Sequence, residues 1–359
     1  DIQRSRGLGD VYKRQGDLNG TKEMSKKHFI DAKVLNEYLE QEIENYKGPL
    51  TIEEFIGGQS NPTYLLKTFS ASYVLRRKPP GNLLKSAHAV DREFRVISAL
   101  NNTDVPVPKA YLHCDDETLI GTEFYVMEFV NGSVIWEPDI PHGTNLDRTE
   151  IYRSMNNTIK KLHNVDPIKI GLEDFGKPGN YVGRQVSRWS KQYQMSETEK
   201  IPAMDNLMKW LPENLPSEKP TRLVHGDFSL TNVIVDDTTN EIASILDWEL
   251  STLGDPVADF SYHCLRYTDN PVISNNENCL NLGIPTFQEY VKMYFENSEF
   301  EVSDDEWNLY MAFNMFKIAA ILQGITGRVR DGTAAGKDAD KLFPQTVELA
   351  NNAWNLINS

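Results

Sequence analysis

The chain has 359 residues, of which 40% are hydrophobic and 25% are charged, a composition typical of a folded protein and not of a disordered chain. Its 52 acidic residues outnumber its 37 basic residues and give a formal net charge of −15, which argues against nucleic acid or an anionic membrane as a partner. At this length we expect two lobes rather than a single hydrophobic core.

The cysteine content and the hydropathy pattern indicate in which cellular compartments the protein is expected. Three widely spaced cysteines form neither a disulfide framework nor a paired metal motif, and they favour a reducing compartment. No run approaches the roughly 18 consecutive apolar residues of a membrane span, so we expect none. The N-terminal residues carry no apolar signal core. We therefore expect a cytoplasmic protein, with an intracellular organelle as the open alternative, and we leave the oligomeric state open.

The first half of the chain is predicted to hold a small, strand-rich lobe. Residues 1–20 show no apolar periodicity and are interpreted as a disordered leader or an artefact outside the fold. The N-terminal lobe, residues 21–130, begins with an amphipathic helix predicted within residues 28–46. Five short strands follow, with a helix at residues 87–100 after the third. The strands are predicted at residues 50–56, 63–69, 72–77, 110–113 and 124–130.

The second lobe, residues 131–359, is predicted to be mainly helical. A β-rich island at residues 223–247 interrupts the helices, with two short apolar strands, 233–235 and 242–246, joined by a polar turn. The pattern as a whole indicates an α+β protein with a small and a large lobe. The helices are predicted at residues 146–164, 183–194, 201–211, 286–295, 305–324 and 339–357.

The strongest chemical signal lies in the β-rich island. The run His225-Gly226-Asp227 is followed by Asn232, and Asp247 ends the hairpin. Phosphoryl transfer needs one carboxylate beside the acceptor hydroxyl, to orient it and take its proton, and Asp227 fits this catalytic role. It also needs oxygen ligands that hold Mg²⁺ against the phosphates of a nucleotide. Asn232 and Asp247 fit that metal-binding role.

This motif resembles the catalytic loop of the aminoglycoside phosphotransferase family, relatives of protein kinases. The run Asp247-Trp248-Glu249 resembles that family's counterpart of the kinase DFG motif, and residues 254–259 are similar to its usual continuation. The resemblance covers the chain from about residue 52 onward. It implies a bilobal, protein-kinase-like α+β fold with a five-stranded antiparallel N-terminal lobe. It also implies ATP and Mg²⁺ as cofactors, bound between the lobes, and a small-molecule hydroxyl compound as the acceptor.

The same resemblance identifies candidates for nucleotide binding in the N-terminal lobe. Residues 55–64 resemble the hairpin that lies over the nucleotide phosphates, and residues 127–130 resemble the hinge whose backbone holds adenine. Small residues and polar side chains in the first segment would supply hydrogen-bond donors to phosphate. The candidates from the two segments are Gly58, Ser60, Asn61, Glu128, Phe129 and Val130.

A charged pair is expected beside these segments. Arg76 stands at the position in the third strand where protein kinases carry a lysine, and Glu93 on the following helix is its expected partner. Both are nucleotide-site candidates through the resemblance. Period-two alternation points Arg77 to the opposite face of the sheet. For His225 we favour a structural role, a hydrogen bond to the backbone of its own loop. Asp255 and Asp259 are interpreted as a turn residue and a helix-start residue.

The acceptor is the least determined part of the prediction. Within the family, the chain looks most like the kinase-like domains associated with acyl-CoA dehydrogenases, which suggests a hydroxyacyl compound or its coenzyme A thioester. Alternatives are an aminoglycoside, another amino alcohol or a sugar, and a nucleotide-binding protein without catalysis. A protein kinase is disfavoured because the chain has no activation-loop pattern. Cations that could form a basic patch for an anionic acceptor are Arg184, Arg188, Lys191, Arg328 and Arg330.

Overall fold

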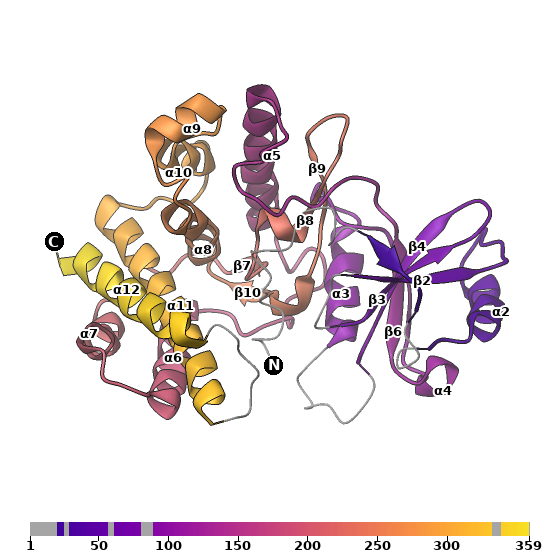
Figure 1. The fold of residues 1–359 in the computed structure, drawn as a ribbon, viewed down its shortest axis with the longest axis horizontal. Helices are drawn as coiled ribbons and strands as arrows, with labels where there is room; N and C mark the ends of the chain where they lie inside the picture. Colours follow the sequence, from indigo (N-terminus) through magenta and orange to yellow (C-terminus); the bar gives the residue numbers. More distant parts are fainter. Residues whose placement is uncertain (1–19, 25–28, 57–60, 80–88, 332–338, 359) are drawn as a thin grey trace. The chain divides into compact units, whose positions relative to one another are not determined.

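The computed structural model describes residues 20–24, 29–56, 61–79, 89–331 and 339–358 (Figure 1). Nearly all of the predicted leader, and both Gly58 and Ser60, lie outside the described residues. The chain divides into two compact units. The first holds the residues up to Lys161 together with Ile168–Leu172 and Ser229–Ser251, and the second holds Leu162–Pro167, Glu173–Phe228 and the chain from Thr252 onward.

A six-stranded antiparallel sheet, in the order β1-β2-β3-β4-β6-β5, forms the centre of the first unit. The five predicted strands are confirmed as β2 to β6. The additional strand β1 pairs with the outer edge of β2 and has only two residues, too few to show an alternating pattern. The bounds are β1 Thr21–Lys22, β2 Thr51–Phe55, β3 Thr63–Lys67, β4 Ser72–Arg77, β5 Ala110–Cys114 and β6 Phe124–Glu128.

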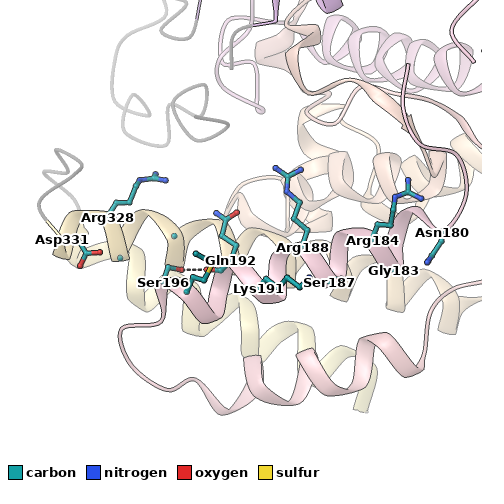
Figure 2. A pocket seen from close by; sticks show the side chains of 13 residues that line it. Asn180, Gly183, Arg184, Ser187, Arg188, Lys191, Gln192, Ser196, Arg328 and Asp331 are labelled. Atoms are coloured by element: carbon teal, nitrogen blue, oxygen red, sulfur yellow. Dashed lines mark hydrogen bonds between the residues drawn. The ribbon is translucent and has the colours of Figure 1, made fainter. Parts of the chain in front are cut away.

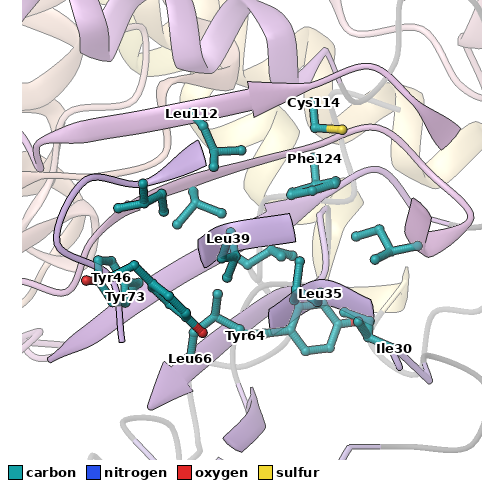
Figure 3. Close-up of a cluster of buried hydrophobic side chains, with 14 residues drawn as sticks. Ile30, Leu35, Leu39, Tyr46, Tyr64, Leu66, Tyr73, Leu112, Cys114 and Phe124 are labelled. Carbon is teal, nitrogen blue, oxygen red and sulfur yellow. The ribbon is translucent and has the colours of Figure 1, made fainter. Parts of the chain in front are cut away.

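One face of this sheet carries a hydrophobic cluster beneath helix α2 (Ala32–Glu42), as Figure 3 shows. Leu35 and Leu39, one turn apart on α2, are fully buried against alternate residues of the strands. Arg77 lies on this face, as its place in the alternation predicts: its guanidinium is 5.2 Å from the centre of the Tyr64 ring. It also donates to the carbonyl of Ile120 at 3.1 Å, at the end of the short helix α4 (Glu117–Ile120).

Helix α3 (Val90–Leu100) covers the opposite face, so the sheet lies between α2 and α3 (Figure 1). The side chains that α3 buries are Val90, Glu93, Val96, Ile97 and Leu100. Glu93 is the one charged residue among them, and it is only 1% exposed. Since an unpaired buried carboxylate is costly, Glu93 requires partners from the sheet.

The first unit also contains a hairpin that comes from late in the sequence. Strands β8 (Val233–Val235) and β9 (Ile242–Ile245) pair with each other. The backbone N–H of Ser133 donates to the carbonyl of Val235 at 2.9 Å, which joins this hairpin to the chain that follows β6. The unit therefore extends past residue 130, and the lobe boundary at that residue stays a prediction. The other elements here are helix α5 (Asn145–Asn164) and the 3₁₀ turns η3 (Leu230–Asn232) and η4 (Trp248–Leu250).

The second unit is built around the long helix α11, which packs against α6, α8 and α12. A two-stranded sheet of β7 and β10 accompanies the helices. The bounds are α6 Tyr181–Ser196, α7 Pro202–Trp210, η2 Leu211–Glu213, β7 Arg222–Val224, β10 Thr252–Gly254, α8 Pro256–Asp269, α9 Asn276–Leu282, α10 Phe287–Phe295, α11 Asp304–Arg330 and α12 Ala339–Asn358.

Two helices of this unit, α11 and α8, are buried over most of their described length. Within the described residues, α11 is long and apolar enough to cross a membrane, but 83% of its most apolar window is buried inside the protein, as in a core helix. Helix α8 is absent from the sequence-predicted elements because nearly every residue of its first turns is buried, so it has no polar face and no helical period. Its N-cap is Asp255, whose carboxylate accepts from Val257 and Ala258.

Candidate functional site

Three charged side chains predicted from the sequence meet in the first unit. The Arg76 guanidinium, on β4, forms ion pairs with Glu93 of α3 (Nε to Oε2, 2.8 Å) and with Asp247 after β9 (Nη2 to Oδ1, 2.7 Å). Their side-chain exposures are 12%, 1% and 24%, so Glu93 is enclosed and Asp247 reaches solvent. The predicted Arg76–Glu93 pair is confirmed, and Asp247 joins it as a second carboxylate.

Glu93 is stabilised by donors from the sheet. Asn61 Nδ2 donates to Oε1 at 2.8 Å, and Tyr125 OH donates to Oε2 at 3.0 Å. Tyr125 lies opposite Arg76 in the β4–β6 register, so both side chains face α3. Asn61, a nucleotide-site candidate, is fully buried in this arrangement. These donors and Arg76 favour the charged carboxylate, but burial outweighs them and raises the pKa of Glu93.

The electrostatics of this cluster keep Arg76 charged. Although burial opposes the charge, the carboxylates of Glu93 and Asp247 raise the pKa of Arg76 above its ordinary value. Burial also raises the pKa of the Tyr125 hydroxyl well above its ordinary value, so this residue remains a hydrogen-bond donor. A fixed positive charge beside a partly exposed carboxylate can bind an anionic group such as a phosphate.

Asp247 and Asn232 lie at the open end of the β8–β9 hairpin. The backbone N–H of Leu246 donates to the carbonyl of Asn232 at 2.8 Å, which continues the pairing of the strands and brings the residue before Asp247 beside Asn232. Asp247 itself has φ 61° and ψ 60°, a left-handed conformation that is rare for residues other than glycine. Backbone strain of this kind collects at functional sites.

The donor set at this hairpin end fits a hard divalent cation. Mg²⁺ prefers oxygen ligands and is usually bound by one or two carboxylates together with substrate phosphates and water. Asp247 offers carboxylate oxygen and Asn232 offers amide oxygen. Among the described residues no group of three or more His, Cys, Asp or Glu side chains could form a metal site of its own. One carboxylate and one amide fit a Mg²⁺ ion whose other ligands come from phosphate and water.

The loop that carries Asp227 lies in the second unit, after β7. Gly226 has φ 85°, a conformation that glycine adopts without strain, and it turns the chain directly before Asp227. Asp227 is partly exposed. His225 is fully buried, and its Nδ1 accepts from the Asp227 backbone N–H at 3.2 Å. This bond is the structural role that the sequence indicates for His225.

Asp259 of α8 forms hydrogen bonds to the backbone of the same loop. Its two carboxylate oxygens accept the backbone N–H groups of His225 and Gly226, each at 2.8 Å. His163 Nε2 lies 3.2 Å from the same carboxylate, and its Nδ1 is 2.7 Å from the hydroxyl of Tyr294. Although burial opposes it, hydrogen bonding to His163 and to the His225 backbone lowers the pKa of Asp259. Asp259 is thus a buried carboxylate that positions the loop, a role more specific than the helix-start residue predicted.

An Asp259→Asn variant is expected to lose about 2–4 kcal/mol of unfolding free energy, because the buried amide cannot replace a carboxylate that accepts from three groups. Urea denaturation followed by circular dichroism measures this. Asp237→Asn, an exposed aspartate in the β8–β9 turn, is the matched control and should change stability by less than about 0.5 kcal/mol. Equal midpoints for the two variants would contradict the positioning role.

His263 contacts the backbone of Phe228, the residue that follows Asp227. Its Nδ1 lies 3.0 Å from the carbonyl of Phe228, and its Nε2 lies 2.8 Å from the hydroxyl of Tyr290. A carbonyl only accepts, so Nδ1 carries the proton and Nε2 accepts from Tyr290. Burial lowers the pKa of His263 from its ordinary 6.5 to about 4. The imidazole is therefore neutral in the folded protein at neutral pH.

This lowered pKa predicts a pH-dependent stability. Between about pH 6.5 and 4 the unfolded chain protonates His263 and the folded chain does not, so stability falls with pH across that window. The contribution is full above pH 6.5, and its loss approaches about 3 kcal/mol near pH 4. The test measures the unfolding free energy of the wild-type chain and of His263→Gln at pH 7 and at pH 5. The decrease in unfolding free energy from pH 7 to pH 5 should be smaller in the variant. An equal decrease would show that other groups cause it.

The remaining candidates are in the hinge-like segment after β6. The Glu128 backbone N–H donates to the carbonyl of Lys109 at 2.8 Å, and its carboxylate accepts from the Lys109 N–H at 3.1 Å. These bonds belong to the edge of the sheet. Phe129 and Val130 follow and are half-buried. Nucleotide binding by these three residues stays a prediction.

Sequence reasoning missed several residues of these networks, among them Tyr125, His163 and His263. Tyr125 could have been found, because period-two alternation on a neighbouring strand places it on the Glu93 face. The two histidines had no local signal, since His163 meets Asp259 across 96 residues and His263 meets Phe228 across 35.

An antiparallel sheet with a buried arginine–glutamate pair, accompanied by a mainly helical region with an aspartate loop, defines a protein-kinase-like α+β protein of the small-molecule phosphotransferase class. Residues 51–290 match the model of the phosphotransferase enzyme family. The chain belongs to this family.

The relatives point to one branch of that family. The chain is 42% identical to acyl-CoA dehydrogenase family member 10 of Mus musculus over 93% of its own length and 32% of that protein. It is 40% identical to acyl-CoA dehydrogenase family member 11 of Rattus norvegicus, over 89% of the chain and 42% of that protein. The chain thus spans a third to two fifths of the length of these curated relatives.

Solved structures agree with the fold. A protein from Ralstonia eutropha named as an aminoglycoside phosphotransferase superposes with a TM-score of 0.84 at 44% identity, over 92% of this chain and 99% of that one. An aminoglycoside phosphotransferase in ternary complex with ADP and hygromycin B has a TM-score of 0.58 at 12% identity, over 88% and 97%. The second likeness concerns the fold alone.

Proposed function

We propose that this chain transfers the γ-phosphoryl group of ATP, with Mg²⁺, to a hydroxyl group of a small molecule. The observation that carries the proposal is the Arg76–Glu93–Asp247 cluster, in which a partly buried, charged guanidinium is held between one enclosed and one accessible carboxylate. Membership of the phosphotransferase enzyme family supports the same reaction class.

Arg76 is the proposed ligand of the nucleotide phosphates. Its guanidinium is oriented by Glu93, so a phosphate oxygen can be bound without reordering the side chain. Glu93 is the positioning residue for Arg76, and Asn61 and Tyr125 orient Glu93 in turn. The proposed backbone donors to the nucleotide are residues 57–61, with Gly58 and Ser60, and the hinge-like residues Glu128, Phe129 and Val130.

Asn232 and Asp247 are the proposed ligands of Mg²⁺. The bound cation would neutralise charge on the nucleotide phosphates as the phosphoryl group moves. The chain's own contribution is to hold the two oxygen donors at one hairpin end, through the backbone bond between Leu246 and Asn232. The ion pair with Arg76 orients the Asp247 carboxylate.

Asp227 is the proposed catalytic residue, which accepts the proton of the acceptor hydroxyl. Its loop is held on both sides, by Asp259 through the preceding amides and by His263 through the following carbonyl. A carboxylate fixed in this way can orient a hydroxyl without reorganising during the reaction. Catalysis would therefore rest mainly on positioning and charge neutralisation.

The proposed acceptor is a hydroxyacyl compound or its coenzyme A thioester. Support comes from the relatives, which are named as members of the acyl-CoA dehydrogenase family. The alternative acceptor, an aminoglycoside or another amino alcohol or sugar, is favoured by the name of the Ralstonia eutropha structure. A nucleotide-binding protein without catalysis is the remaining alternative.

A screen for acceptor-dependent release of ADP separates these alternatives. The purified chain, ATP and Mg²⁺ are incubated with hydroxyacyl-CoA thioesters, free hydroxy acids, aminoglycosides and amino alcohols. We expect ADP release with a hydroxyacyl compound. Release with aminoglycosides alone would replace the proposed acceptor. Binding of ATP with Mg²⁺, but no ADP release with any compound, would favour the non-catalytic alternative.

A further inference from the structure

A groove of about 910 Å³ runs along helix α6 in the second unit, with the C-terminal part of α11 as its other wall (Figure 2). The lining of this groove is basic, whereas the chain as a whole is acidic. The lining cations are Arg184, Arg188, Lys191 and Arg328. These are four of the five cations that the sequence suggests for a basic patch. Figure 2 shows the guanidinium groups of Arg184, Arg188 and Arg328 on the same side of the two helices.

The cations share one stripe of α6 because they follow each other at helical spacing. Arg184, Arg188 and Lys191 stand four and three residues apart, so they lie one above the other on the face toward α11. Arg184 donates to the carbonyls of Lys177 at 2.6 Å and Pro178 at 3.4 Å. These bonds orient its guanidinium and leave its charge unneutralised.

Two carboxylates lie at the ends of the groove: Glu218, which accepts from the Asn180 backbone N–H at 3.1 Å, and Asp331. The carboxylate in its lining is Asp331, and it forms an ion pair with Arg330 at 2.9 Å. Arg330 is not among the lining residues; it donates to the carbonyl of Glu197 at 3.3 Å. Arg330, the fifth predicted cation, therefore lies outside the groove and forms an ion pair with Asp331 at the end of the groove. The lining thus contains four basic side chains and one carboxylate, in a chain of net charge −15.

The walls of the groove are held together by direct contacts. Gln323 of α11 donates to the carbonyl of Ser196, the last residue of α6, at 2.7 Å. A β-carbon added at Gly327 would lie 3.0 Å from that same carbonyl oxygen, so glycine permits the close approach of the two helices. The groove is therefore a preformed feature of the packing and does not depend on a moving segment.

The groove starts beside the strands that carry the catalytic loop. A β-carbon added at Gly254 of β10 would lie 2.9 Å from the ring of Tyr181, the first residue of α6, so this end of the helix packs on the β7–β10 sheet. The lining runs from Asn180 to Ser196, about 24 Å along the helix axis at 1.5 Å per residue. An extended ligand can thus have one end near the sheet and the other at Lys191 and Arg328.

We propose that the α6–α11 groove binds the phosphate-bearing end of the acceptor, whose hydroxyl lies at the other end of an extended molecule. Several guanidinium groups in a row match an organic diphosphate, since each can bind phosphate oxygens through two N–H groups. The exposed side chain of Met195, 87% accessible, adds an apolar contact beside the cations. This inference rests on the proposed function for the role of the hydroxyl, but the binding site is tested without turnover.

The binding test uses the full chain saturated with AMP-PNP and Mg²⁺, so that the nucleotide site is occupied. Coenzyme A is titrated by calorimetry into the wild-type chain and into the double variant Arg188→Gln/Lys191→Gln. We expect coenzyme A to bind the wild-type chain and the double variant to bind at least ten times more weakly. Raising the salt concentration should weaken binding to the wild-type chain. The control Arg153→Gln/Lys209→Gln removes the same charge from exposed helix positions outside the groove, and should bind as the wild type.

A second titration, with inorganic pyrophosphate, identifies the source of the phosphate. If coenzyme A binds more tightly than pyrophosphate, and if both bind the double variant more weakly, the result supports a coenzyme A thioester as the acceptor. Equal binding of the two supports a simple phosphate ester. The proposal is overturned if neither probe binds, or if the double variant binds like the wild type with an unchanged melting temperature. Asp227→Ala should still bind coenzyme A, so failure of the groove and failure of the phosphotransfer reaction give different results.

Discussion

An Asp227→Ala variant is expected to turn over about 10²- to 10⁴-fold more slowly than the wild-type chain, with little change in its affinity for ATP and Mg²⁺. The substitution removes the carboxylate that accepts the acceptor proton. The loop itself should stay in place, because Asp259 and His263 hold its backbone at His225, Gly226 and Phe228. Rates of ADP release give kcat and KM, and calorimetry gives the nucleotide affinity.

The matched control for this variant is Asp237→Ala, which removes an exposed carboxylate from the β8–β9 turn. It should leave kcat within twofold of the wild type. If Asp227→Ala kept the wild-type kcat, Asp227 would not be the catalytic residue, and the chain would be better described as a kinase-like nucleotide-binding protein.

An Asp247→Asn variant is expected to bind ATP in the presence of Mg²⁺ about 100-fold more weakly, because a charged metal ligand contributes several kcal/mol. Asparagine is the informative substitution, since it tolerates the left-handed backbone of this position (φ 61°) and removes only the charge. Alanine would add about 1–2 kcal/mol of backbone strain. Calorimetric titration of ATP, with Mg²⁺ and with EDTA, measures the metal-dependent part.

The same titrations define the contrary outcome. Glu241→Gln, at an exposed position of the same hairpin, is the control and should bind ATP with Mg²⁺ as the wild type does. In EDTA, Asp247→Asn and the wild-type chain should bind ATP about equally. If Asp247→Asn bound ATP with wild-type affinity in the presence of Mg²⁺, Asp247 would not be a metal ligand. Its pair with Arg76 would then be only a structural contact.

The groove along α6 bears on the choice of acceptor. An aminoglycoside is cationic and would be repelled by Arg184, Arg188, Lys191 and Arg328, whereas a phosphate-bearing acceptor would be attracted. The charge of this surface therefore favours the hydroxyacyl thioester over the aminoglycoside among the proposed acceptors.

Alternation and spacing were enough to predict five of the six strands of the sheet and the opposite facing of Arg76 and Arg77. Residues 72–77 alternate so that Arg76 and Arg77 must face opposite sides, and the structure has Arg76 beside Glu93 and Arg77 over Tyr64. Helix α8 could not be predicted in this way, because its first turns are buried on nearly every side and have no apolar stripe for a periodic pattern to report.

By itself the sequence determined the elements and the short-range motif, because strand alternation, helix period and turn residues act over a few neighbouring positions. The spacing of the motif predicted Asp227, Asn232 and Asp247 as a set, and the family resemblance implied the pairing of Arg76 with Glu93. Only the tertiary structure decided which distant groups meet. Arg76 and Asp247 are 171 residues apart in the sequence, and the fold brings their side chains to 2.7 Å. Contacts at such separations depend on how whole elements bury their surfaces, and no local pattern encodes that.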